Sequence, residues 1–528
     1  MSATLPDIEE ASSFLPASSS VQNGCLPGAS ENYVVSRLRK RRLEREAFVG
    51  DSFVAGTKSV FVRTWGCSHN SSDAEYMAGL LTEAGYRVLQ EQGERWEADA
   101  WLLNSCTVKT PSEMQFRHLI EEGLKAGLPV ILAGCVPQAE PSAHWLNGLS
   151  IVGVQQIDRI VEVLEQTLQG NCVRLLAPRR VNMTRVAGAP LTLPKIRRNP
   201  LVEILAINTG CLNHCTYCKT KQARGSLVSY PPEELIARAR QAFSEGVKEI
   251  WLTSEDLGAY GRDLGLVLPD LLSELVQEIP DGCRLRLGMT NPPYILDHLE
   301  EMASILNHPR VYKFLHIPVQ SGSDAVLWKM RREYTSADFR RIVEFMREKV
   351  PGISIATDFI CGFPGEEEAD FEQSLQLIRD YRFPSVFINQ FYSRPNTPAA
   401  SMRPAVGSAE KKSRTRRMSS LFHSYSSFLA EERVGCVYEA LVTAPSEDGR
   451  FLVGHNDFYE QLLLPKKEGL MGRLMRVRVT AVGKFSMHAR PIRDYMSISR
   501  LLGRRVIGFV ATTVVVALLL LLLFWRWF

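Results

Sequence analysis

The sequence predicts an α/β protein of several domains that ends in a transmembrane helix. Three observations predict this fold class. Strand-like runs alternate with amphipathic helices from Ser59 to Phe391, first in a set of three strands and then in a set of six. Short strand-like runs follow without helices between them, and an uncharged apolar stretch closes the chain. The 528 residues are enough for three or more domains of about 100–200 residues each.

Composition narrows the classes of function. With 45% hydrophobic residues the chain can bury large cores, and its net charge of only +4 means that any nucleic-acid binding must come from local basic patches. The residues from Met1 to Pro16 lack the basic start and apolar core of a secretory signal. The chain has eleven cysteines, and thiols that hold metal clusters need a reducing compartment. We therefore expect chemistry that faces the cytosol.

Residues 1–57 form a leader that is rich in Ser, Ala, Pro and Gly and then turns basic. Six Lys and Arg residues crowd the segment from Arg37 to Arg45. We interpret this leader as disordered and solvated, and the alternative is an arm that contacts RNA.

Residues 58–170 are predicted to form a doubly wound parallel sheet. Strand-like runs at 59–64, 98–103 and 128–133 alternate with helices such as 73–85 and 112–126. In such sheets the carboxyl ends of the strands form the ligand crevice. Each of these strands runs into a cysteine, so three thiols should lie along one edge and share a metal cluster. We call them the N-terminal trio: Cys67, Cys106 and Cys135.

Residues 171–199 are rich in Arg and Pro and are predicted to be a linker. Residues 200–430 then follow a (βα)6 pattern, which predicts a partial barrel with its site at the carboxyl ends of the strands. The expected strands are 201–208, 247–253, 283–289, 312–317, 353–360 and 385–391. The expected helices are 233–245, 268–278, 296–306, 337–349 and 366–381.

The first barrel strand runs into three cysteines spaced C-x3-C-x2-C, which we call the central triad: Cys211, Cys215 and Cys218. Four-iron cubes usually take four cysteines, so three thiolates leave one iron open to a substrate. The alternative is a zinc site. Zinc prefers a closed set of four ligands, and no second pair of cysteines lies nearby.

Polar residues also follow the later barrel strands. Ser254, Glu255 and Asp256 come after the second strand, and Gln320 after the fourth. The Glu255 carboxylate suits an ammonium group of a ligand, and the alternative is a carboxylate that stabilises a helix N-terminus.

The central triad, with the aromatic Tyr217 before its last cysteine, resembles the signature of the radical S-adenosylmethionine (SAM) superfamily. The resemblance implies a [4Fe-4S] cluster on the central triad and SAM on the open iron, where SAM is split to a 5′-deoxyadenosyl radical. It also implies SAM contacts from Tyr217, Gln320 and the run Ser254-Glu255-Asp256, whose carboxylate would meet the methionyl amine. Arg224 would contact either the SAM carboxylate or the tRNA backbone.

Motifs around the N-terminal trio resemble the methylthiotransferases. They are Thr64-Trp65-Gly66-Cys67, Asn104-Ser105-Cys106-Thr107 and Ala133-Gly134-Cys135. The resemblance implies a second [4Fe-4S] cluster that carries the sulfur. The runs 219–225, 288–293 and 357–366 are similar to the branch that acts on threonylcarbamoyladenosine beside the anticodon of tRNA. One departure is Asn396 in place of a common glycine, and Asn tolerates the positive φ that the turn needs.

Two alternatives remain open. One is the same chemistry on isopentenyladenosine or on a protein side chain, and the other is a membrane-anchored RNA-binding or regulatory protein without catalysis. Sulfur and electron donors are further partners that the reaction requires, and the sequence does not identify them.

Residues 431–494 are predicted to form a small β-barrel, which resembles a TRAM domain and would bind tRNA. Its strands are expected at 436–443, 451–454, 460–464 and 474–482. Basic residues near Phe458, Tyr459 and Phe485 suit single-stranded RNA, and solvated barrel edges are the alternative.

Residues 495–528 are predicted to be a tail anchor with a helix at about 506–525. Val506 to Phe524 carries no charge, and as a helix it would span roughly 28 Å. Arg504 and Arg505 place its start in the cytosol. We expect the endoplasmic reticulum membrane, a choice that rests on the eukaryotic, tail-anchored branch of the family; a buried core helix is the alternative.

Overall fold

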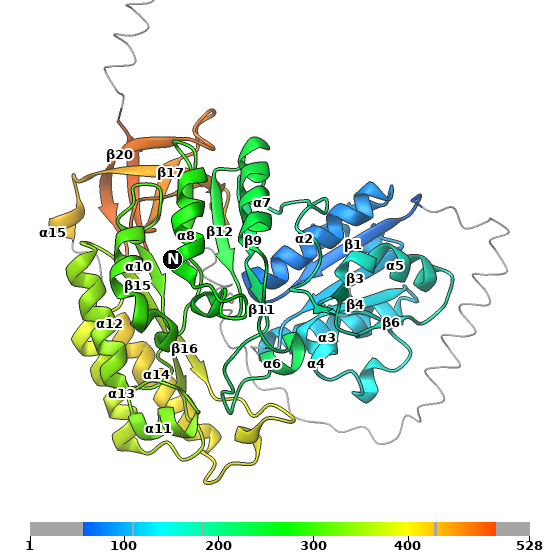
Figure 1. The fold of residues 1–528 in the computed structure, drawn as a ribbon, viewed down its shortest axis with the longest axis horizontal. Helices are drawn as coiled ribbons and strands as arrows, with labels where there is room; N and C mark the ends of the chain where they lie inside the picture. The colour runs from blue at the N-terminus through cyan, green and yellow to red at the C-terminus, as the bar shows by residue number, and fades with distance from the viewer. Residues whose placement is uncertain (1–55, 108–109, 182–183, 427–429, 493–528) are drawn as a thin grey trace, which may run out of the picture.

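The computed structural model describes residues 56–492 apart from 108–109, 182–183 and 427–429. Three units are visible in Figure 1: an α/β unit in blue and cyan, a larger unit in green and yellow, and a small orange barrel. Residues 1–55 of the predicted leader and the tail anchor predicted at 506–525 lie outside the described residues. Within the described ranges, no helix is both long enough and apolar enough to span a membrane.

The N-terminal unit contains the predicted parallel sheet, with strand order β2-β1-β3-β4-β5-β6. The order reverses between β1 and β3, as it does at the ligand crevice of doubly wound sheets. The sequence did not predict β2, a short strand at the edge of the sheet, and β6 lies in the segment assigned to the linker. The strands are β1 (Ser59–Thr64), β2 (Arg87–Leu89), β3 (Ala100–Ser105), β4 (Val130–Gly134), β5 (Ser150–Val152) and β6 (Arg174–Leu175).

Helices cover both faces of this sheet because alternate side chains of each strand point to opposite sides. Val60 and Val62 pack with one group of buried residues, and Phe61 packs with another. The first group includes residues of α2 (Ser68–Glu83) and α5 (Ile160–Leu168), and the second includes residues of α3 (Thr110–Lys125). The doubly wound arrangement is therefore as the sequence predicted.

The central unit has six parallel strands in the predicted succession. They form two three-stranded sheets, β13-β12-β9 and β14-β15-β16. Among the described residues, single-residue bridges from Leu285 to Val311 and from Met289 to His316 join the two sheets. The strands are β9 (Val202–Ala206), β12 (Glu249–Thr253), β13 (Arg284–Arg286), β14 (Phe314–His316), β15 (Ser354–Cys361) and β16 (Ser385–Gln390). The helices are α7 (Pro232–Ser244), α8 (Leu268–Leu275), α10 (Leu299–Leu306), α12 (Ser336–Lys349) and α13 (Glu368–Tyr381), followed by α14 (Ser408–His423).

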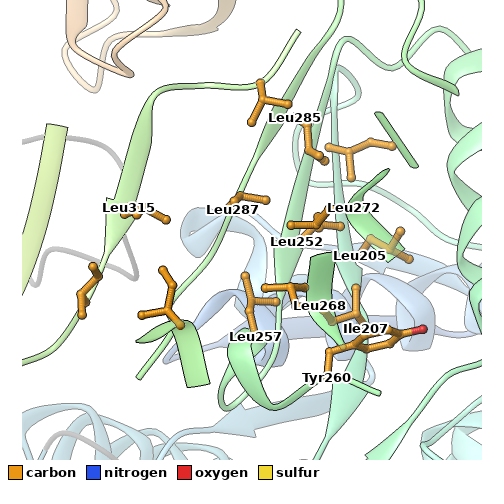
Figure 2. Close-up of a cluster of buried hydrophobic side chains, with 14 of the residues drawn as sticks. Leu205, Ile207, Leu252, Leu257, Tyr260, Leu268, Leu272, Leu285, Leu287 and Leu315 are labelled. Atoms are coloured by element: carbon orange, nitrogen blue, oxygen red, sulfur yellow. The ribbon is translucent and has the colours of Figure 1, made fainter. Parts of the chain in front are cut away.

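An aliphatic layer holds the outer helices on the strands. Figure 2 shows Leu205 of β9, Leu252 of β12 and Leu315 of β14 among the buried side chains, with Leu268 and Leu272 of α8 near Leu205 and Leu252. Burying each such side chain contributes about 1.5–3 kcal/mol. This layer fixes the positions of the strand ends on which the site is built.

The C-terminal unit is the predicted small β-barrel. It closes in the order β17-β18-β19-β21-β20, and the sequence missed β21. It packs against the amino ends of the central strands, where Arg284 binds Asp457 at 3.2 Å and the Tyr459 ring contacts Phe314. The carboxyl ends of those strands are left for the site. The strands are β17 (Val437–Pro445), β18 (Phe451–His455), β19 (Gln461–Pro465), β20 (Leu474–Val482) and β21 (Ser486–Pro491).

Candidate functional site

The central triad lies on one loop at the carboxyl end of β9. Gly210 starts the loop with φ +77°, and a Cβ there would lie 2.2 Å from the Ser226 carbonyl oxygen, so glycine is needed. The loop is fixed to the barrel because the Thr216 amide donates to the Met330 carbonyl at 3.0 Å. It ends in the short helix α6 (Thr220–Arg224). The sequence prediction that the triad follows the first barrel strand is thus confirmed.

The three thiols of the central triad share one electrostatic environment. Burial raises the pKa of Cys211 and Cys218, and the neighbouring thiols of the triad raise both further. Donors nevertheless point at the sulfurs: the Arg332 guanidinium donates to Cys215 Sγ at 3.1 Å, and the Thr220 amide to Cys218 Sγ at 3.4 Å. Half-buried thiols that accept hydrogen bonds from Arg332 and Thr220 suit thiolates that bind a positively charged metal group.

The N-terminal trio lies around Asn70, in the first turn of α2. Cys67 precedes that helix, Cys106 follows β3, and Cys135 follows β4 and begins the helix α4 (Cys135–Ala139). The Asn70 amide donates to the carbonyls of Trp65 at 3.1 Å and Ser105 at 2.9 Å. Its Oδ1 accepts from Cys135 Sγ at 3.6 Å.

Close backbone packing holds two loops of the trio together. A Cβ on Gly66 would lie 2.3 Å from Cys106 Cβ, and one on Gly134 would lie 2.3 Å from the Ser105 carbonyl oxygen. The two loops that carry Cys67 and Cys106 are therefore in contact. The strand ends converge as the sequence predicted.

Neither set of cysteines is arranged for a single metal ion. Among the residues that the structure describes, no three or more His, Cys, Asp or Glu side chains form a site for one ion. A four-iron cube binds each thiolate through a different iron, so its ligands need not converge on one point.

Charged side chains connect the two cysteine sites. Arg224 Nη2 donates to Asn70 Oδ1 at 2.6 Å and to Asp73 Oδ2 at 2.7 Å. Arg394 lies close enough to both Cys106 and Cys218 to interact electrostatically with a cysteine of each site. It also pairs with Glu113 at 3.3 Å. The two sites therefore lie on either side of one polar boundary between the N-terminal and central units.

Glu255 takes part in this boundary. Its Oε1 lies 2.9 Å from His69 Nδ1 and 3.5 Å from Arg224 Nε. Burial alone would raise the pKa of Glu255, but His69 and Arg224 together lower it. Its Oε2 is buried and has no hydrogen-bond partner among the described residues, so one oxygen is left for an ammonium group such as the one the sequence predicted.

The neighbours of Glu255 have structural partners. Asp256 accepts from the backbone N–H and side-chain amide of Asn291 at 3.0 and 2.7 Å, and Ser254 Oγ accepts from the Asp256 amide at 3.1 Å. Burial raises the pKa of Asp256 to about 6. These bonds fix the loop after β12, and the SAM contacts expected of Ser254 and Asp256 stay predictions.

The other predicted contacts have defined places. Tyr217 packs edge-on against Phe363, with ring centroids 6.4 Å apart. Gln320 has φ +67°, and its backbone N–H donates to the Asp358 carbonyl at 2.8 Å. Arg224 is 2% exposed, and its contact with either the SAM carboxylate or the tRNA backbone stays a prediction. Asn396 has the positive φ, +61°, that its turn was expected to need.

Sequence reasoning missed Asn208 and Arg332 near the central triad, whereas Thr290 was expected there because it follows the third barrel strand. Asn208, two residues after β9, is fully buried, and neither polar atom of its side chain has a partner among the described residues. Thr290 Oγ1 is also buried without a partner. Arg332 joins Cys215 to Asn291. Such unpaired polar atoms are costly unless a ligand satisfies them, so they fit a polar molecule bound beside the triad.

Comparison with known proteins gives consistent matches. Residues 205–378 match the Radical SAM superfamily, and residues 59–148 match the Uncharacterized protein family UPF0004. The chain is 57% identical over 464 residues to the Xenopus laevis threonylcarbamoyladenosine tRNA methylthiotransferase, covering 87% of this chain and 82% of that protein. Proteins of the same name from Homo sapiens (56% identical, 87% of this chain and 80% of that one) and Drosophila melanogaster (59%, 84% and 80%) also match.

Proposed function

We infer, because the chain belongs to the threonylcarbamoyladenosine tRNA methylthiotransferase family, that it is a radical SAM enzyme that modifies tRNA. Its substrate is threonylcarbamoyladenosine beside the anticodon, and its product is the 2-methylthio derivative. The observation that carries this proposal is that two sets of three cysteines, each at the carboxyl ends of parallel strands, lie across one boundary that Arg224 and Asn70 bridge.

We propose that the central triad holds the [4Fe-4S] cluster that the radical SAM superfamily requires, and that the N-terminal trio holds a second one. When bound, the first cluster and SAM supply a carbon radical, and the second cluster supplies the sulfur. The convergence of Cys67, Cys106 and Cys135 around Asn70 supports the second cluster.

Residues of the chain bind and orient the central triad and the SAM molecule. Arg332 holds Cys215 and Asn291 in one place through two arms of its guanidinium. Glu255 Oε2 is free to accept the methionyl ammonium of SAM, and Asn208 and Thr290 offer polar atoms to the same bound molecule. The C-terminal barrel covers the amino ends of the central strands, so substrate approaches from the carboxyl ends.

Surface chemistry near the central triad supports an RNA substrate. A cavity of about 890 Å³ is lined by His214 and Thr216, which flank Cys215. Its lining carries both signs of charge: Lys329, Arg331, Arg332 and Arg403, and Glu333, Glu366 and Glu367. The Trp328 ring beside it is 79% exposed. Cations with an exposed aromatic ring suit the phosphates and unstacked bases of a tRNA loop.

Mass spectrometry of tRNA nucleosides tests the substrate. Cells that lack the protein should lose 2-methylthio-threonylcarbamoyladenosine and regain it with the wild-type chain, while methylthiolated isopentenyladenosine stays constant. An unchanged level of the first nucleoside would reject the proposal. Loss of the second alone would favour the isopentenyladenosine alternative.

Purified protein tests the non-enzymatic alternative. A regulatory RNA-binding protein would bind tRNA and yield no 5′-deoxyadenosine from SAM after anaerobic reconstitution. The proposed enzyme yields 5′-deoxyadenosine and binds about eight irons per chain, four for each cube.

We also propose that residues 506–525 anchor the protein in the endoplasmic reticulum membrane with its catalytic units in the cytosol. The uncharged run from Val506 to Phe524 and the arginines before it support this. A chain that ends at residue 494 should move from the membrane fraction to the soluble fraction and keep its activity. Equal membrane association of both chains would contradict the anchor.

A further inference from the structure

Arg224 crosses the boundary between the N-terminal and central units. It ends α6, six residues after Cys218, and its side chain is only 2% exposed. Its guanidinium reaches Asn70 and Asp73 of α2 at 2.6 and 2.7 Å and Glu255 of its own unit at 3.5 Å. One cation in the central unit is thus held by two side chains of the other unit.

Asn70 connects Arg224 to all three loops of the N-terminal trio through hydrogen bonds. Its Oδ1 accepts from Arg224 and from Cys135 Sγ, and its Nδ2 donates to the carbonyls of Trp65 and Ser105. Trp65 lies two residues before Cys67, and Ser105 lies one residue before Cys106. A movement of the Asn70 amide would therefore displace every loop of the trio.

Apolar packing supports the same alignment. The side chain of Ala223, next to Arg224, is buried against Cys135 and Val154. The short helices α4 and α6 lie side by side at the boundary, below the centre of Figure 1. Because α4 begins at Cys135 and α6 follows Cys218, the pair links one cysteine of each site directly.

We propose that Arg224 is a positioning residue that holds the N-terminal trio at a fixed place opposite the central triad, acting through Asn70. This rests on the proposed function, in which a radical formed at one site and sulfur held at the other must meet on one substrate. The contacts of Arg224 in this structure are to Asn70 and Asp73 of the N-terminal unit and to Glu255 of the central unit. The role of Arg224 is to keep the distance between the two sites constant, because a misplacement of about 1 Å can cost about 100-fold in rate.

The test is Arg224→Lys in the full chain. Lysine keeps the charge but presents one compact ammonium group and not a planar fork, so it cannot hold Asn70, Asp73 and Glu255 together. The variant should bind as much iron as the wild type and still form 5′-deoxyadenosine, at a rate lowered by the lost contact with Glu255. The 2-methylthio product formed per 5′-deoxyadenosine should fall by roughly 10-fold to 100-fold.

A matched control is Arg284→Lys. Arg284 is also buried, and it pairs with Asp457 across the other boundary of the central unit at 3.2 Å. This variant should keep the wild-type ratio of product to 5′-deoxyadenosine. Asp73→Asn is a milder second variant, because it weakens the ion pair with Arg224 without removing a bond to the trio. It should also lower the ratio of product to 5′-deoxyadenosine, as Arg224→Lys does.

Four outcomes separate the possibilities. A folded Arg224→Lys with the wild-type product ratio would overturn the proposal, and so would equal losses of iron, 5′-deoxyadenosine and product in both Arg224→Lys and Asp73→Asn. A wild-type chain that forms 5′-deoxyadenosine but no methylthiolated nucleoside would instead reject the proposed function. A low ratio in both variants, with full iron and a normal Arg284→Lys, supports the proposal.

Discussion

Replacing Gly66 by alanine should remove the second cluster and leave the first. Gly66 has φ +115°, and a Cβ there would lie 2.3 Å from Cys106 Cβ and 2.9 Å from Cys106 Sγ. Carbon atoms normally approach to about 3.5–4.0 Å. The loop between β1 and α2 would therefore have to move by more than about 1 Å, and Cys67, its next residue, would move with it.

The cost of this substitution has two parts. Backbone strain at a positive φ contributes about 1–2 kcal/mol, and overpacking contributes about 1–3 kcal/mol more. A matched control isolates the first part. Gly127 also has a positive φ, +71°, but a Cβ there would meet nothing within 4 Å. Gly127→Ala should therefore lose only about 1–2 kcal/mol of stability.

Iron analysis and SAM cleavage are the assay. Gly66→Ala should bind about four irons per chain where the wild type binds about eight. It should still form 5′-deoxyadenosine, because the central triad is untouched, and it should form no methylthiolated nucleoside. Gly127→Ala should match the wild type in all three measurements. A Gly66→Ala chain that binds wild-type iron and forms product would refute the assignment of a cluster to the N-terminal trio.

Three further predictions follow from single contacts. Cys215→Ala should abolish 5′-deoxyadenosine formation. Its affinity for tRNA in a filter-binding assay should stay within about two-fold of the wild type, since other surfaces bind the RNA. A variant that loses tRNA binding but still forms 5′-deoxyadenosine would contradict the role of Cys215. Arg332→Lys removes a charged hydrogen bond to Cys215 Sγ that is worth about 1.5–3 kcal/mol. The midpoint potential of the cluster on the central triad should therefore fall by up to about 60–130 mV in an EPR-monitored titration. An unchanged potential would speak against this contact. The pKa of Asp256 is raised from 3.8 to about 6 in the folded chain. Its favourable contribution is therefore full below about pH 4 and is lost as the pH rises through about 6. Urea unfolding of the apoprotein should show about 1.4 kcal/mol less stability at pH 7.5 than at pH 5 from this group, a difference that Asp256→Asn removes; an equal pH dependence in both chains would show that Asp256 is not the cause.

Local patterns predicted most of the fold. Strand and helix periodicities depend on neighbouring residues, so they located the parallel sheet, the six barrel strands and the closed C-terminal barrel. The elements that sequence reasoning missed are short ones, such as β2 at Arg87–Leu89 and β21 at Ser486–Pro491. Their pairing with a neighbouring strand defines them, and a few residues carry too little periodicity to predict it.

The sequence alone determined where the cysteines of each set lie in the fold, because residues that lie three or four positions apart, or that directly follow strands, are placed by local backbone structure. Only the tertiary structure decided how the two cysteine sites are joined. Arg224 and Asn70 are separated by 154 residues, and His69 meets Glu255 from another unit of the fold. No local pattern specifies such partners, since the packing of one unit against the other brings them together. Because these side chains are buried, losing one of these contacts is costly: a charge that is removed from water needs a partner at a fixed distance.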